Sequence, residues 1–226
     1  MKGVTESARL PNVPPPQQNL REAAALALSA VRAQSREQLE WLGGRPRADR
    51  WRLEVLDDLL TVDLAEGSVR TSEGQTVGPW WQILTLHYLA TSSRPAQPPP
   101  EVTFAVLPAG RAYAAVYQQR VIERLCRSVG RDRASLLEAG QRLGGKTVDA
   151  GDAAFDFQVY PRLRLRLVWY AGEQEPPANH ELHDPEPRLP PSAVLLLPSN
   201  IEDFLAVEDI VVLSERIVSR LSGGRF

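Results

Sequence analysis

The sequence predicts a single α+β domain over residues 19–222, in which a mixed or antiparallel sheet is packed by several helices. Segments with apolar residues at helical spacing are interleaved with segments in which every second residue is apolar. The two kinds of segment do not alternate as regular βαβ units, and no internal repeat is evident. With 226 residues, 43% hydrophobic and 24% charged, the chain has an ordinary globular composition and enough length for a substantial core.

The helical segments are delimited by residues that favour helix ends. Asn19 is a candidate N-cap, and Pro79 is of a type favoured in the first turn. The helix after Pro79 has apolar residues around most of its circumference, so we expect it to be central and buried. Ser199 and Glu202 match a capping box, in which each side chain satisfies the other residue's free amide. Helices are therefore predicted from Asn19 to Gly43-Gly44, from Pro79, over about 110–129, from Asp132 to Gly144-Gly145, and from Ser199 to just before Gly223-Gly224.

The strand segments are marked by alternation between apolar and polar residues. Leu53 and Val55, and then Leu60, Val62 and Leu64, alternate in this way, which predicts a β-meander over about 51–71. A short strand or an extended segment is predicted at 102–106, and further strands at 154–160, 162–170 and 194–197. Residues 1–18 are polar and end in prolines, so we expect a flexible tail there and a short tail at 223–226.

Charge and cysteine content narrow the classes of function. The formal net charge is −2, so no global field favours nucleic acid or an anionic membrane. A row of arginines from Arg120 to Arg131 has no interleaved aromatics and belongs to no known nucleic-acid module, so we expect no nucleic-acid partner. Cys126 is the only cysteine, which excludes an intrachain disulfide or a thiolate-held iron–sulfur cluster. Because no apolar run approaches the roughly 20 residues that span a bilayer, we expect a soluble cytoplasmic protein without membrane contact.

Short motifs occur along most of the chain in an order and spacing that match one family. They are Ile83–Leu89, Thr103-Phe104 before a Pro-Ala-Gly turn and Tyr113, Leu143-Gly144-Gly145, Gly151-Asp152, Val159-Tyr160-Pro161, and a C-terminal helix that opens with Val207-Glu208-Asp209. Together they resemble the uncharacterised bacterial and archaeal family called domain of unknown function 3786. The resemblance implies a cytoplasmic accessory protein of anaerobic or one-carbon metabolism. Some such proteins are joined to an iron–sulfur segment, a role that the single cysteine does not support here.

The chain departs from the family pattern after Gly172. The family shows an acidic turn, a Phe-Pro and later a Leu-Phe-Asp, whereas this chain has Glu173-Gln174-Glu175-Pro176-Pro177 and then Glu181-Leu182-His183-Asp184. His183 stands where the family has phenylalanine. A site that the family keeps in this stretch would therefore be altered or lost here.

His180, His183 and Asp184 form a candidate metal site. On a helical turn, two histidines three residues apart would share one face, and imidazole with carboxylate suits zinc or iron(II). Prolines on both sides argue against a regular helix, and a structural metal site normally needs four ligands. A solvated loop is therefore the competing interpretation.

Arg162, Arg164 and Arg166 form a candidate site for an anionic ligand. Because side chains alternate along a strand, the three guanidinium groups are expected on one face, with Leu163 and Leu165 on the other. Such a row of donors can bind phosphate or carboxylate groups. A solvated sheet face, or protection of an edge strand, explains the same pattern without a ligand.

His87 is the candidate general base of an enzyme. It would need an acid to orient it, for which Asp152 is the candidate, with Glu173 and Glu175 completing the catalytic set. A histidine within an apolar helix is also typical of a core residue with a satisfied hydrogen bond, and Asp152 can equally cap a turn. The chain contains none of the common glycine-rich phosphate-binding or nucleophile-elbow motifs.

Three functions remain open from the sequence. The first is a non-enzymatic cytoplasmic accessory or ligand-binding protein with an anionic ligand. The second is an enzyme with a His/Asp/Glu site, and the third is a protein-interaction module that uses the helix from Ala109 and the N-terminal tail. Convergence of His87, Asp152 and Glu173 or Glu175 would favour the enzyme, a concave arginine-lined pocket would favour anion binding, and an exposed apolar patch without a cavity would favour protein interaction. The sequence identifies no cofactor, substrate, partner or oligomeric state.

Overall fold

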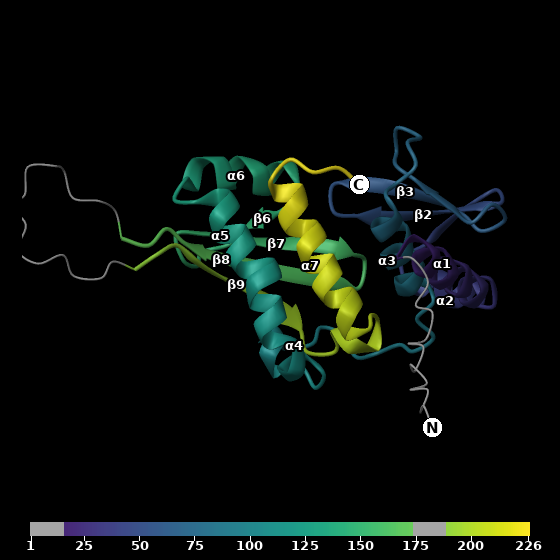
Figure 1. Cartoon of the computed structure of the whole chain (residues 1–226). Helices are drawn as coiled ribbons and strands as arrows, with labels where there is room; N and C mark the ends of the chain where they lie inside the picture. Colours follow the sequence, from purple (N-terminus) through teal and green to yellow (C-terminus); the bar gives the residue numbers. More distant parts are fainter. Residues whose placement is uncertain (1–15, 174–188) are drawn as a thin grey trace, which may run out of the picture.

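The computed structural model describes residues 16–173 and 189–226 and contains two antiparallel sheets with helices packed around them (Figure 1). This confirms the α+β class, although the strands form two sheets where the sequence suggested one. The first, sheet A, has the strand order β1-β2-β3-β4, and the second, sheet B, has the order β5-β9-β8-β7-β6. A continuous hydrophobic core joins residues from both halves, so the molecule is one domain.

The secondary structure follows most of the predicted segments. The strand expected at 102–106 is wrong beyond Thr103, because the amide of Leu107 bonds to the carbonyl of Phe104 and closes a 3₁₀ turn, and the short strands at 45–47 and 146–147 were not expected. The strands are β1 (Arg45–Arg47), β2 (Arg50–Val55), β3 (Asp58–Asp63), β4 (Ser68–Arg70), β5 (Glu101–Thr103), β6 (Lys146–Thr147), β7 (Ala153–Tyr160), β8 (Leu163–Tyr170) and β9 (Ser192–Pro198). The α-helices are α1 (Pro16–Arg32), α2 (Arg36–Trp41), α3 (Pro79–Leu89), α4 (Gly110–Tyr117), α5 (Glu123–Val129), α6 (Arg133–Arg142) and α7 (Val207–Leu221). Two 3₁₀ turns, η1 (Phe104–Val106) and η3 (Ile201–Asp203), and a π-helical turn, η2 (Gln118–Ile122), complete the described elements.

Sheet A and helices α1 to α3 form the smaller half of the molecule (Figure 1). In β2, Leu53 and Val55 are fully buried, whereas Arg52 and Glu54 point to the opposite face, as the two-residue period of a strand requires. Helix α3 is buried along most of its length and has Pro79 in its first turn, which confirms both predictions for this helix.

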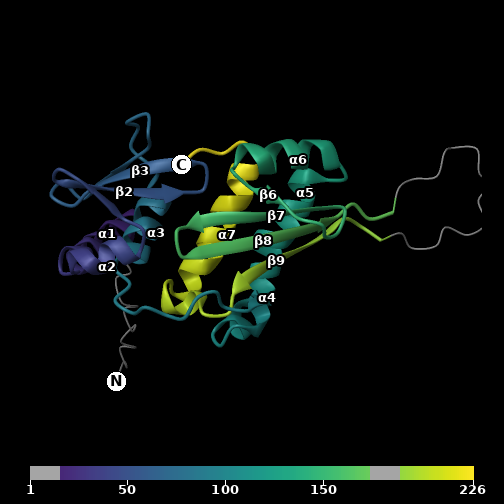
Figure 2. The ribbon, with the colours of Figure 1, turned by 180° about the vertical axis from the view of Figure 1, so that it is seen from behind.

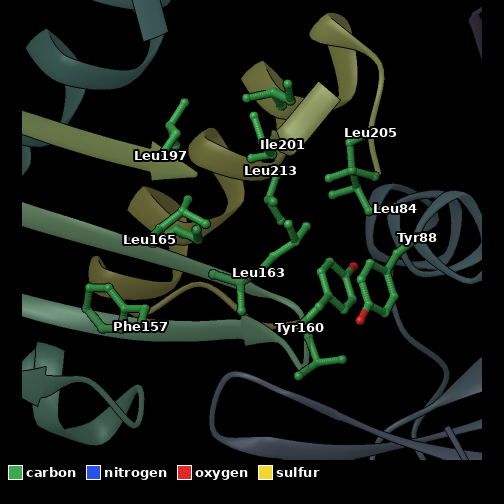
Figure 3. Packing of buried hydrophobic residues seen from close by; sticks show 14 of the residues in the cluster. Leu84, Tyr88, Phe157, Tyr160, Leu163, Leu165, Leu197, Ile201, Leu205 and Leu213 are labelled. Atoms are coloured by element: carbon green, nitrogen blue, oxygen red, sulfur yellow. The ribbon is translucent and has the colours of Figure 1, made fainter. Parts of the chain in front are cut away.

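Sheet B has helices over one face. In Figure 1, α4, α5 and α7 lie in front of β7, β8 and β9, and Figure 2 shows from behind that no helix of the described residues crosses the other face. The covered face presents Phe157, Leu165 and Leu197 to the core, where they lie near Leu213 of α7 (Figure 3). The alternation in β8 therefore has the predicted result, with leucines inward and arginines outward.

The two halves meet at a stacked pair of tyrosines. The rings of Tyr88, in α3, and Tyr160, at the end of β7, have centroids 4.4 Å apart and planes 11° apart (Figure 3). The Tyr88 hydroxyl donates to the carbonyl of Leu42 at 2.7 Å and accepts from the amide of Arg162 at 3.1 Å. Burial raises the pKa of both tyrosine hydroxyls, so they stay protonated. The stack therefore connects α3, the end of α2 and the β7–β8 turn in a site without solvent access.

The β2–β3 hairpin makes a second connection between the halves. The amide of Leu56 donates to the carbonyl of Val159 at 3.3 Å, which extends the end of β7 towards sheet A. Beside it, the carboxylate of Asp57 accepts from Arg220 of α7 at 2.7 Å. A backbone bond and an ion pair therefore hold the hairpin against sheet B.

Gly43 ends α2, as predicted, and its lack of a side chain allows close packing. Its φ of +89° lies in the left-handed region. A Cβ at this position would lie 2.4 Å from the side chain of Pro161 in the β7–β8 turn. Only glycine satisfies the backbone conformation and the close approach together.

The first predicted helix is interrupted. α1 begins at Pro16, before the expected Asn19, and a break separates it from α2. The hydroxyl of Ser35 accepts from the amide of Gln38 at 3.1 Å, so it caps the start of a new helix. The buried amide side chain of Gln38 donates to the carbonyl of Thr91 at 2.9 Å, which fixes α2 against the loop after α3.

The capping box predicted at Ser199 is wrong. The carboxylate of Glu202 accepts from the amide of Ala109 at 3.0 Å, and the amide of Ser199 donates to the carbonyl of Pro100 at 2.8 Å. Both groups therefore form hydrogen bonds with other segments of the chain instead of with each other. This stretch forms only the turn η3. The last helix begins at Val207, as the family resemblance implied.

Replacement of Tyr88 tests the junction between the halves. Tyr88→Phe keeps the ring stack but leaves the buried Leu42 carbonyl and Arg162 amide without their partner, so we expect the free energy of unfolding to fall by about 2–4 kcal/mol. Tyr160→Phe is the matched control. It removes a hydroxyl whose contact is a long 3.4 Å approach to Thr85, and we expect a loss of about 1 kcal/mol or less. Denaturant unfolding followed by fluorescence measures both, and equal losses would contradict this account of the junction.

Candidate functional site

His87 lies in the last turn of α3 and is bonded to α7. Its Nδ1 is 2.7 Å from Oδ2 of Asp209, which lies in the first turn of α7. Asp209 is at the helix end whose dipole stabilises a negative charge. The His87 side chain is 31% exposed and that of Asp209 17%, so the pair is partly shielded from solvent. A carboxylate in this position orients an imidazole, and here it also links the two halves of the molecule.

Asp152 is placed away from His87. Its carboxylate accepts from the amide of Ala171 at 2.8 Å, and it closes the turn before β7. Tyr160, which stacks on the helix of His87, is at the other end of β7, and eight strand residues span roughly 23 Å at about 3.3 Å each. The structure therefore does not bring Asp152 to His87, and Asp209 occupies the orienting position instead.

The acidic residues proposed to complete the catalytic set do not approach His87 either, where they are described. Glu173 follows β8, and its amide donates to the carbonyl of Leu189 at 3.1 Å. It lies at the same end of sheet B as Asp152, because Ala153 of β7 is directly opposite Trp169 of β8. Glu175, and the candidate metal ligands His180, His183 and Asp184, lie outside the described residues.

Arg162 is engaged in packing. Its Nε donates to the carbonyl of Trp41 at 2.7 Å, and its guanidinium carbon lies 4.8 Å from the centroid of the Trp41 ring. Its backbone amide binds Tyr88. The side chain therefore connects the β7–β8 turn to α2, and a ligand would have to compete with the Trp41 carbonyl for it.

Arg164 and Arg166 lie on the uncovered face of sheet B as predicted, but carboxylates surround them. Arg166 makes two hydrogen bonds to Asp156, at 2.6 and 3.0 Å, and lies 3.1 Å from Glu101. Arg164 lies 2.8 Å from Glu101 and 3.4 Å from Asp156. The pKa of Asp156 is held below its ordinary value, chiefly by the hydrogen bond from Arg166, with Arg164 and Lys146 adding to the effect and burial opposing it. The row is thus largely neutralised by the protein itself.

The arginine row on the long helix is divided in a similar way. Arg120 makes two bonds of 2.8 Å to the carboxylate of Glu215 in α7, and Arg127 lies 3.9 Å from Glu123. The π-helical turn η2 also changes the spacing along the row. This helix therefore does not present a uniform basic stripe.

A second set of arginines was not singled out in the sequence. Arg45 and Arg47 of β1, Arg50 and Arg52 of β2, and Arg70 of β4 share the outward face of sheet A, because cross-strand partners in an antiparallel sheet point the same way. We call this surface the arginine face. The signal was present in the printed sequence, since Arg45 and Arg47, and then Arg50 and Arg52, alternate as strand residues do.

Not every cation of the arginine face has a partner. Arg45 lies 2.9 Å from Glu54, Arg50 lies 2.9 Å from Asp63, and Arg70 lies at the longer distance of 3.9 Å from Glu66. In the part of the chain that the structure describes, Arg47 and Arg52 have no acidic side chain within 4.0 Å. The backbone amide of Glu66, helped by Arg50 and opposed by burial, lowers the pKa of Asp63, so this carboxylate is ionised and stays committed to Arg50.

A cavity opens on the arginine face around the β1–β2 hairpin. Its volume is about 460 Å³, and its lining residues are Arg47, Ala48, Asp49, Arg50, Arg52 and Thr61. A second cavity, of about 300 Å³, adjoins Arg162 and Arg164 on sheet B, but Glu101 also lines it and neutralises Arg164. The sheet A cavity therefore has the larger excess of unpaired guanidinium groups.

Comparison with known proteins identifies the family of the chain. A family model described as a domain of unknown function, DUF3786, matches residues 36–183, which is more than half of the chain. The chain belongs to the DUF3786 family. No curated protein and no solved structure matches it.

The DUF3786 match covers some of the candidate residues and leaves out others. His87, Asp152 and all the arginines of both sheets lie within it, whereas α1 and α7, with Asp209, lie outside. The His87–Asp209 pair thus joins a residue inside the matched region to a helix beyond it. None of the helices in 16–173 and 189–226 combines the length and apolar character needed to cross a bilayer.

Among the described residues of this DUF3786 protein, neither the potential metal ligands nor Cys126 points to a further site. There, no three histidine, cysteine, aspartate or glutamate side chains are grouped so that they could hold a metal. Burial raises the pKa of the Cys126 thiol, with the charge of Glu123 adding to the increase, so the thiol is less reactive than an exposed one.

The lowered pKa of Asp156 in the charge cluster of sheet B predicts that the stability of the fold depends on pH. Asp156→Asn leaves Arg166 without its two hydrogen bonds to a carboxylate, so we expect the free energy of unfolding at pH 7 to fall by about 1–2 kcal/mol. A carboxylate with a lowered pKa stabilises the fold above its unfolded pKa of about 3.9 and loses that contribution as the pH falls through the folded value. The difference between wild type and variant should therefore shrink below about pH 4.

The control for this prediction is Asp149→Asn, since Asp149 is exposed and has no ion pair among the described residues. Denaturant unfolding at pH 7, 5, 4 and 3 provides the comparison. A constant Asp156→Asn difference across this range, or one as small as that of Asp149→Asn, would contradict the prediction.

Proposed function

We propose that this DUF3786 chain is a cytoplasmic accessory ligand-binding protein, and that its arginine face binds a small anionic molecule through phosphate or carboxylate groups. The cytoplasmic part of the proposal rests on the single cysteine of the sequence. The ligand-binding part rests on the geometry of the β1–β2 hairpin, and its site differs from the arginine row that the sequence favoured.

One observation carries the proposal: like charges face each other across the hairpin. Arg45 is directly opposite Arg52, and Arg47 is directly opposite Arg50. Like charges in directly opposed positions destabilise a sheet. In each pair the fold neutralises only one member, so Arg47 and Arg52 remain as two unpaired cations on neighbouring strands. An anion between them would relieve the repulsion.

The cavity around these two arginines suits such a ligand. Its volume of about 460 Å³ falls within the range of small-molecule sites. Guanidinium groups match oxyanions with two parallel hydrogen bonds, and the hydroxyl of Thr61, directly opposite Arg52, offers another donor. Asp49 in the hairpin loop opposes binding, which leaves a moderate excess of positive charge.

The hairpin backbone also supports a site at this position. Ala48, in the cavity wall, has a backbone φ of +51°, a conformation that residues other than glycine rarely adopt. Residues held in such conformations concentrate at ligand-binding positions. The uncovered face of sheet B offers the opposite case, since its arginines are already bonded to Glu101 and Asp156.

Titration with pyrophosphate tests this function. We expect Arg52→Gln and Arg47→Gln each to weaken binding at least ten-fold, because each removes a charged hydrogen-bond donor. Asp49→Asn should strengthen binding, since it removes the opposing charge at the rim. Arg164→Gln is the matched control on sheet B and should bind like the wild type. Calorimetry at two salt concentrations measures the affinities, and added salt should weaken them.

Two results would contradict the proposed function. One is wild-type protein that does not bind pyrophosphate at low salt. The other is binding that Arg164→Gln weakens as much as Arg52→Gln, which would place the anion on sheet B.

A further inference from the structure

We propose that the edge of β9, together with helix α4 and turn η2, is a docking site for an extended peptide that adds a strand to sheet B. The site is independent of the arginine face, because it lies on the other sheet and involves none of the same residues. It would make the protein an adaptor that binds a segment of another protein chain.

The edge of β9 is only partly occupied. β9 has seven residues, but its outer neighbour β5 has three, which pair with Leu196, Leu197 and Pro198. Over Ser192 to Leu195 no described strand pairs with the outer edge, while β8 pairs with the inner edge. Alternate residues of this stretch therefore direct their N–H and C=O groups away from the sheet, and such an edge is a template for another strand.

The chain leaves this edge open for a structural reason. After Thr103 it turns into η1, moves away from β9, and then forms α4, η2 and α5, which lie alongside β9 (Figure 1). The result is a groove of about 370 Å³ between a strand edge and a helix. We call it the edge groove; the residues that give it its form are Thr103, Ala105, Ala114, Gln118, Ala193 and Val194.

The size and the apolar character of the residues that line the edge groove determine which peptide side chains fit into it. Alanines at 105, 114 and 193 leave space, and the stacked rings of Phe104 and Tyr117, 4.0 Å apart, provide an apolar surface beneath. Val194 is 36% exposed at the rim. A strand that pairs with β9 turns every second side chain towards the groove, so its occupant carries small or medium apolar residues at alternate positions.

A positive charge beside the edge groove indicates that the bound peptide carries a negative one. Arg111 precedes Ala114 by three residues and Gln118 by seven, so it continues the helix row that lines the edge groove. It is exposed and has no acidic partner among the described residues. It lies in the first turn of α4, where the helix dipole also favours an anion. The peptide is therefore expected to carry an acidic residue or its terminal carboxylate at this end.

The helical wall of the edge groove is firmly anchored. The hydroxyl of Tyr117 donates to Ser214 at 3.0 Å, and Arg120 makes its two bonds to Glu215, both from the α4–η2 region to α7. Burial raises the pKa of the Tyr117 hydroxyl, with the bond to Ser214 opposing it, so the hydroxyl remains a donor. A wall fixed in this way loses little conformational freedom on binding.

A displayed library of random heptapeptides tests the inference, with the full chain as bait and fluorescein-labelled synthetic copies of the enriched sequences for measurement. The key variant is Ala114→Leu, which fills the edge groove. Its control is Ala112→Leu, on the exposed side of the same helix. We expect enriched peptides with apolar residues at alternate positions and at least one acid. Ala114→Leu should weaken their binding at least ten-fold and Arg111→Glu at least three-fold, whereas Ala112→Leu should leave it unchanged.

Other outcomes would overturn the inference. Peptides that bind Ala114→Leu and Ala112→Leu equally well would place the site elsewhere, and a library without enrichment would leave the groove without a peptide ligand. Circular dichroism first establishes that both variants fold. Sedimentation of the wild type adds a separate check, because a dimer that Ala114→Leu dissociates would show that a second copy of the chain covers this edge.

Discussion

The stacked pair of Tyr88 and Tyr160 holds the two halves of the molecule in one arrangement. The Tyr88 hydroxyl is shared between the Leu42 carbonyl and the Arg162 amide, so a single side chain connects α3 to the end of α2 and to the β7–β8 turn. The surrounding bonds, from His87 to Asp209 and from Asp57 to Arg220, cross the same junction. The arginine face and the edge groove lie on different sheets that share one continuous core, so neither site overlaps the other.

The two sheets differ in how many of their arginines are paired with acidic side chains. On sheet B the fold surrounds Arg164 and Arg166 with Glu101 and Asp156, and Arg162 is bonded to Trp41. On sheet A the hairpin sets arginines directly opposite each other and supplies acids for only part of them. Ion pairs at a surface contribute modestly to stability, so the unpaired arginines can be retained at small cost. In the proposed function an anionic ligand supplies their counter-charge.

Much of the fold follows from the sequence, because helix and strand periods are local properties. The three long strands of sheet B (β7, β8 and β9), the buried helix after Pro79 and the Asp132 cap lie where the pattern puts them. Partners distant in the chain were not predictable in this way. Glu202 was expected to bond Ser199 but bonds Ala109, and His87 was paired with Asp152 but meets Asp209. Such choices depend on which segments pack together, and short motifs do not encode that.

In both candidate sites, the alternation of arginines along a strand predicts the face on which they lie, but not the residues that they contact. Alternation correctly placed Arg164 and Arg166 on an outward face, but it carried no information about Glu101, which approaches from β5. The alternation of Arg45, Arg47, Arg50 and Arg52 was equally visible, and only the hairpin register shows that these arginines oppose one another. The register therefore turns a common surface pattern into a candidate anion site.

The proposed function requires that an anion selects the arginine face of sheet A over the arginines of sheet B. Titration of isotopically labelled protein with pyrophosphate, followed through backbone amide chemical shifts, tests it most directly. If the anion binds at the arginine face, we expect saturable shifts at residues 45–52 and at Thr61, with residues 162–166 unaffected. Saturable shifts centred on 162–166, or none at 45–52, would contradict it.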